Sequence, residues 1–72
     1  MTRSKSKVSN RIRELRFQHG EMTQEQLATD VGVSRQTIIA IEQGRYCPSL
    51  ESAMRMARLF GLGVEQVFQL ED

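Results

Sequence analysis

The chain has 72 residues, a length that fits one small domain, and we expect no separate catalytic domain. Its formal net charge is +1, and Cys47 is its only cysteine, so an internal disulfide is excluded. His19 is the only histidine and lies far from Cys47 in the chain, which argues against a metal site. The sequence has no apolar run long enough to span a bilayer and no signal-peptide pattern. We therefore expect a cytoplasmic protein that does not bind a membrane.

The first seven residues are polar and basic and show no periodicity. We expect 1–7 to form a basic, partly disordered tail ahead of a single domain at 8–72. Six cations and one acid, Glu14, stand among the first 16 residues; the cations are Arg3, Lys5, Lys7, Arg11, Arg13 and Arg16. Two interpretations stay open for these charges, a solvated surface or a set of contacts to phosphate groups.

Two short helices are predicted before residue 33. The first covers 9–19, where apolar residues recur at helical spacing until Gly20. The second begins after Thr23, which forms a capping-box pattern with Gln26, and it ends at Gly32. The second helix therefore has only about two turns.

Three further helical segments follow. Ser34 is a suitable cap for a helix at 35–43, and Ser49 for a fourth helix that continues to residue 60. The predicted apolar stripe of this fourth helix consists of Leu50, Ala53, Met54, Ala57, Leu59 and Phe60. A last amphipathic turn or two is expected at 64–68. The pattern thus predicts five short helices in one compact unit.

The third helix has the chemistry of a DNA reader on its outer face. If Ile38 and Ile41 turn inward, helical geometry places the opposite flank in solvent. Gln36 could bond adenine, Arg35 could bond guanine or a phosphate, and apolar side chains suit a thymine methyl. Such polar residues often serve only solubility, but an exposed Ile39 favours a contact surface. The predicted base-reading residues are Arg35, Gln36, Ile39 and Ala40.

Residues 9–68 resemble the Cro/Xre family of phage repressors. The family pattern Q-x-x-L-A-x-x-x-G-V-S-x-x-T-I-x-x-I-E-x-G is matched from Gln24 to Gly44. The resemblance implies an all-α fold, a five-helix lambda-repressor-like DNA-binding domain, with a helix-turn-helix core at 23–43. It also implies that the helix at 35–43 is the recognition helix. Ala40 departs from the long polar residue of some members, which leaves only a methyl contact there, or none.

The resemblance further implies phosphate contacts at the start of the second helix and around the third. A helix N-terminus offers free N–H groups and a positive dipole end, which suits an anion. The predicted phosphate-contacting residues are Thr23, Gln24, Ser34, Gln43 and Arg45. By the same resemblance, Arg16 and Glu42 form an ion pair that fixes the orientation of the helices.

A homodimer is predicted because one helix-turn-helix buries too little surface for selective binding. Two copies would read the half-sites of a pseudo-palindromic operator, ~34 Å apart. The predicted dimer surface consists of Val64, Val67, Phe68 and Leu70. Compact members of the resembled family further suggest that Lys5 to Val8 and Phe68 to Leu70 pair as a short antiparallel sheet.

These features predict a transcriptional regulator, most simply a repressor, with double-stranded DNA as its partner. The sequence contains no grouping of nucleophile, base and acid and no glycine-rich phosphate loop. We therefore predict no enzymatic activity, no cofactor, no metal and no small-molecule substrate. The alternative is an antitoxin-type interaction module that neutralises a protein partner.

Overall fold

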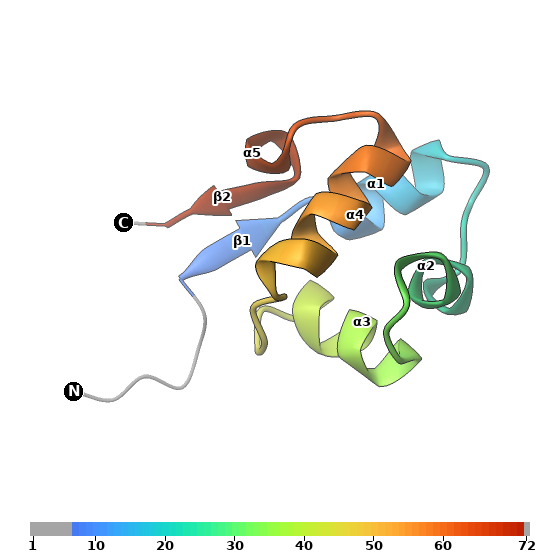
Figure 1. Ribbon diagram of the computed structural model, residues 1–72, viewed down its shortest axis with the longest axis horizontal. Helices are drawn as coiled ribbons and strands as arrows, with labels where there is room; N and C mark the ends of the chain where they lie inside the picture. Colours follow the sequence, from blue (N-terminus) through green and yellow to red (C-terminus); the bar gives the residue numbers. More distant parts are fainter. Residues whose placement is uncertain (1–6, 72) are drawn as a thin grey trace.

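The computed structural model describes residues 7–71, which contain five helices and a two-stranded antiparallel sheet (Figure 1). In chain order the elements are β1 (Val8–Asn10), α1 (Ile12–Gln18), α2 (Gln24–Val31), α3 (Arg35–Glu42), α4 (Leu50–Phe60), α5 (Val64–Val67) and β2 (Phe68–Leu70). The predicted five-helix fold with a short terminal sheet is confirmed. None of these helices has the length and apolar character that a membrane span requires.

Side-chain caps begin three of the helices where the sequence predicts them. Thr23 and Gln26 form a capping box at α2: the Gln26 N–H donates to Thr23 Oγ1 at 3.0 Å, and the Thr23 N–H donates to Gln26 Oε1 at 2.8 Å. The Ser34 hydroxyl accepts from the Thr37 N–H at 3.1 Å at the start of α3. Ser49 caps α4 in the same way. Each cap satisfies an amide that the helix itself leaves unpaired.

One core joins all five helices. Its buried apolar residues are Ile12, Leu15, Leu27, Ala28, Val31, Ile38, Ile41, Ala53, Met56, Ala57, Phe60, Val67 and Phe68. The predicted stripe of α4 is partly wrong, because Leu50 and Met54 are exposed and Met56 is fully buried. The buried line of α4 is rotated toward Met56, which packs beside Ala53 and Phe60 in the core cluster.

The β1–β2 ribbon ties the two ends of the described chain together, away from α2 (Figure 1). Val8 is opposite Leu70 and Asn10 is opposite Phe68. Two predictions are corrected here. The first strand lies at 8–10 instead of 5–8, of which residues 5 and 6 fall outside the described part, and α1 begins at Ile12 instead of Ser9. Local sequence could not show this, because the pairing partner is about 60 positions away.

The predicted dimer surface also needs correction. Val67 is fully buried and Phe68 is only 9% exposed, because both side chains belong to the core of their own chain. Val64 is partly buried against the same core, whereas Leu70 is 76% exposed. Of the four predicted residues, Leu70 is thus the one whose side chain is mostly exposed. Except for Lys7, the predicted basic tail at 1–7 lies outside the described residues.

Candidate nucleic-acid interface

A three-residue turn sets the angle between α2 and α3. Gly32 ends α2 with a φ of 86°, a left-handed conformation that costs glycine little and other residues more. The N–H groups of Gly32 and Val33 both donate to the Ala28 carbonyl, at 2.8 and 3.0 Å. Val33 then packs against the core, and Ser34 caps α3. The chain therefore changes direction sharply within three residues, as a helix-turn-helix requires.

The flank of α3 opposite the core faces outward. Ile38 and Ile41 are buried in the core, which fixes the rotation of the helix about its axis. On the other flank Arg35, Gln36 and Gln43 are exposed, while Ile39 and Ala40 are partly buried. The four predicted base-reading residues therefore share one accessible side of α3.

A hollow of about 750 Å³ lies beside this flank, where α1, α2 and α3 meet. Its lining residues are Arg13, Arg16, Phe17, Thr23, Gln24, Glu25, Arg35, Ile39, Glu42 and Gln43. Phe17 was not expected here; it is 53% exposed, and the Arg13 guanidinium lies 5.7 Å from the centre of its ring. The hollow thus adds an aromatic ring and a cation from α1 to the surface next to α3.

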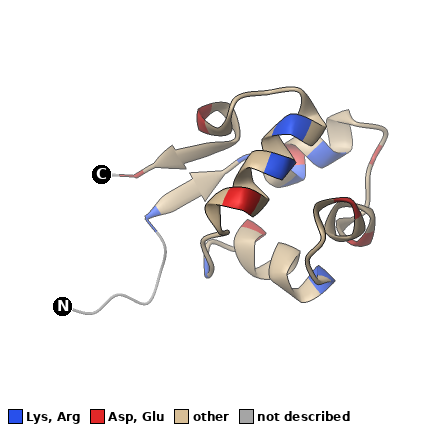
Figure 2. Cartoon of the chain, viewed as in Figure 1, with Lys and Arg blue, Asp and Glu red and all other residues tan. Residues whose placement is uncertain are grey.

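The predicted phosphate-contacting residues fall into two groups. Thr23, Gln24 and Gln43 line the hollow, whereas Ser34 and Arg45 lie at the two ends of α3. Basic residues also mark both ends of this helix, Arg35 at its start and Arg45 in the loop that follows (Figure 2). The Arg45 Nε–H donates to Gln43 Oε1 at 2.9 Å, so these two exposed side chains are held together. A cation thus lies at each end of α3.

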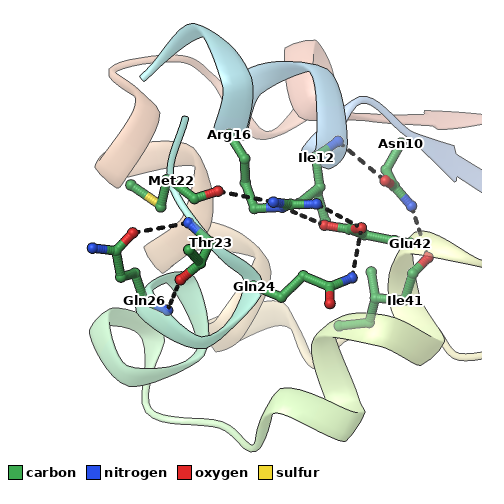
Figure 3. Close-up of polar contacts among 9 residues, drawn as sticks. All are labelled: Asn10, Ile12, Arg16, Met22, Thr23, Gln24, Gln26, Ile41 and Glu42. Carbon is green, nitrogen blue, oxygen red and sulfur yellow. Dashed lines mark hydrogen bonds and ion pairs between the residues drawn. The ribbon is translucent and has the colours of Figure 1, made fainter. Parts of the chain in front are cut away.

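Glu42, at the end of α3, is bonded by side chains from two other helices (Figure 3). The Arg16 guanidinium of α1 donates to both carboxylate oxygens, at 2.7 and 3.1 Å, and it also donates to the Met22 carbonyl at 2.8 Å. The Gln24 amide of α2 donates to Glu42 Oε1 at 3.1 Å. The side chains of Arg16 and Glu42 are each only 9% exposed. This network joins α1, α2 and α3, and within it the Gln24 side-chain amide is already hydrogen-bonded to Glu42.

A family model described as helix-turn-helix matches residues 12–67, which include all five helices. The chain belongs to this helix-turn-helix family. An HTH-type transcriptional regulator of Methanocaldococcus jannaschii, itself uncharacterized, is 49% identical over 65 residues, 90% of this chain and 97% of the relative. The cryptic phage CTXphi transcriptional repressor RstR of Vibrio cholerae is 32% identical over 59 residues, 82% of this chain and 52% of RstR.

Solved structures of helix-turn-helix regulators have the same fold. The restriction-modification controller protein C.AhdI of Aeromonas hydrophila superimposes with a TM-score of 0.69 at 30% identity, covering 78% of this chain and 83% of C.AhdI. The predicted resemblance to phage-repressor-type regulators is confirmed by the family match and by these relatives. The outward flank of α3 is thus the exposed surface of the second helix of a helix-turn-helix.

Proposed function

We propose that this chain is a sequence-specific transcriptional repressor that inserts α3 into the major groove of an operator. One observation carries the proposal: buried Ile38 and Ile41 hold the flank with Arg35 and Gln36 toward solvent. Arginine and glutamine make paired hydrogen bonds to guanine and adenine, and an apolar side chain such as Ile39 suits a thymine methyl. A repressor relative, RstR, supports the proposed direction of regulation.

Phosphate contacts in this proposal surround α3. Gln24 stands at the first position of α2, where free backbone amides and the positive dipole end favour an anion. Because its side-chain amide is bonded to Glu42, we assign the phosphate contact at Gln24 to the backbone. Arg45 follows α3, and Arg13 in the hollow adds a cation on the α1 side. Such contacts position the protein and carry little base preference.

The proposal includes a homodimer. One helix-turn-helix contacts few base pairs, and two copies related by a two-fold axis extend the surface to two half-sites. Leu70 is our candidate for the centre of the contact, because it is 76% exposed at the end of β2. The operator is then a pseudo-palindrome with half-site centres ~34 Å apart.

Selection of bound duplexes from a random pool tests this function directly. We expect the purified chain to enrich one pseudo-palindromic sequence, and the mass of the complex to correspond to two chains per duplex. A pool that stays random through repeated rounds, with retention that only follows salt concentration, would show that the chain is not a sequence-specific regulator. If one chain enriched a single half-site, the proposed homodimer would be rejected, but the proposed recognition of bases by α3 would stand.

A further inference from the structure

The end of α3 is held by a residue outside the helix-turn-helix. Asn10, the last residue of β1, donates from Nδ2 to the Ile41 carbonyl at 2.9 Å (Figure 3). Its other side-chain atom, Oδ1, accepts from the Ile12 N–H at 3.1 Å, at the start of α1. One amide therefore satisfies a free donor of α1 and an acceptor in the last turn of α3.

This bond adds a second attachment to the one at Glu42. The Ile41 carbonyl also accepts from the Gly44 N–H at 3.0 Å, so Asn10 occupies a further lone pair at the point where α3 ends. Glu42, the next residue, is tied to α1 and α2 by Arg16 and Gln24. The last turn of α3 is thus bonded from three sides, and Asn10 is the link to the ribbon.

The ribbon in turn fixes the place of Asn10. This residue is opposite Phe68, and the neighbouring Arg11 N–H donates to the Val67 carbonyl at 3.0 Å. Val67 and Phe68 are buried in the core, so the strand that supports Asn10 cannot shift freely. The residues matched by the family model begin at Ile12, so Asn10 precedes the segment that this model covers.

We infer that Asn10 is a positioning residue for base recognition, acting through the last turn of α3. The inference depends on the proposed function. An eight-residue helix is ~12 Å long, so a tilt of about 5° at one end moves the other end by about 1 Å. Paired hydrogen bonds to base edges tolerate only about half an ångström of error, whereas attraction to phosphates is far less sensitive to geometry. Loss of the bond should reduce binding to the operator and leave binding to random DNA unchanged.

Two substitutions separate the two roles of Asn10. The hydroxyl of serine in Asn10→Ser can still accept from the Ile12 N–H, but its shorter side chain lacks the amide donor that bonds the Ile41 carbonyl. Asn10→Asp also keeps the acceptor for the Ile12 N–H and turns a carboxylate oxygen toward the Ile41 carbonyl. The control is Ser9→Ala, because Ser9 precedes Asn10 on β1. The Ser9 hydroxyl donates to the Glu71 carboxylate, which follows β2 in the same chain, and not to α3.

The measurement is the ratio of operator affinity to random-duplex affinity, with the operator taken from the selection experiment. We expect about a 10-fold lower ratio for Asn10→Ser and a larger loss for Asn10→Asp, against an unchanged ratio for Ser9→Ala. Amide hydrogen exchange should become about fivefold faster at Gly44 in both Asn10 variants. An unchanged ratio in a folded Asn10→Ser protein would overturn the inference, as would equal losses on operator and random DNA. If the parent chain selects no operator, the proposed function fails, and the exchange rate at Gly44 alone then decides whether Asn10 holds α3.

Discussion

The Glu42 carboxylate receives three hydrogen bonds, which join the end of α3 to α1 and α2. In Glu42→Gln the Arg16 guanidinium would remain buried without a counter-ion. We expect the free energy of unfolding to fall by about 3 kcal/mol, because an uncompensated buried charge is costly. Urea denaturation of both proteins measures the difference.

The exposed pair of α4 is a matched control for that substitution. Glu51 accepts from the Arg55 guanidinium at 2.7 Å, but the two side chains are 73% and 54% exposed. Solvent screens such a pair, so Glu51→Gln should change the free energy of unfolding by less than about 1 kcal/mol. Equal losses in the two variants would mean that burial does not distinguish the pairs.

Gln36 gives the most direct test of base reading. It is exposed at the second position of α3, on the outward flank. Gln36→Ala should cost about 1–3 kcal/mol of operator binding and relax the preference at one base position, because a paired hydrogen bond to a base edge is lost. Repeating the selection with the variant shows which position loses its preference.

Arg45→Ala is the control for contacts to the backbone of DNA. Here we expect weaker binding to all sequences alike and a salt dependence whose slope is lower by about 1. If Gln36→Ala lost as much affinity for random duplexes as for the operator, the flank of α3 would not be reading bases.

At the scale of elements, the turn between α2 and α3 depends on one backbone conformation. A Cβ at Gly32 would meet no atom within 4 Å, so space is available, but the φ of 86° disfavours a side chain. Gly32→Ala should therefore lower the free energy of unfolding by about 1 kcal/mol through backbone strain. Thermal unfolding measures this loss.

Gly63→Ala serves as the comparison for that loss. Gly63 has a φ of −81°, which alanine adopts readily, and the nearest atom to its Cβ would be Glu65 Oε1, at 3.3 Å on an exposed side chain that can rotate. A stability loss at Gly63 as large as that at Gly32 would contradict the strain argument.

Local signals predicted the helices better than they predicted the chain ends. Thr23, Ser34 and Ser49 mark helix starts by a chemistry that acts within three residues, and all three caps are present. Ser9 and Asn10 are also good cap residues in local terms, yet they lie in β1. Their conformation depends on β2, at the other end of the chain, and no local pattern contains that information.

In the candidate site, too, some features follow from local sequence and others from contacts between distant segments. The outward flank of α3 follows from helical spacing once Ile38 and Ile41 are placed inside. The Arg16–Glu42 ion pair, present in the structure, was suggested by the family resemblance and not by spacing. Asn10 and Phe17 could not be predicted, because their roles arise from segments that meet only after folding.

For the molecule as a whole, the placement of Val67 and Phe68 in the core narrows the proposed dimer contact to the end of β2. Leu70→Glu would replace an exposed apolar side chain with a charge at that contact. The variant loses a leucine from each copy of the homodimer, which is worth about 3–6 kcal/mol in total and corresponds to a rise of about 10²- to 10⁴-fold in the dimer dissociation constant. Sedimentation at several concentrations measures it.

Leu50→Glu provides the comparison, since Leu50 is 72% exposed but lies on α4. We expect its dimer dissociation constant to match that of the parent chain. If Leu50→Glu dissociated the dimer and Leu70→Glu did not, the dimer interface would lie on α4 and not at β2.

The pairing of β1 with β2 also has a consequence for synthesis of the protein on the ribosome. The residues of β1, α1, α2 and α3 are translated before residues 68–70, and until those residues are made β1 has no strand beside it. The strand pairing that supports Asn10 beside the Ile41 carbonyl is therefore complete only after residues 68–70 have been translated. On the proposed role of Asn10, a partly synthesised chain would hold the last turn of α3 less firmly, and selective DNA binding would depend on the pairing of residues 68–70 with β1.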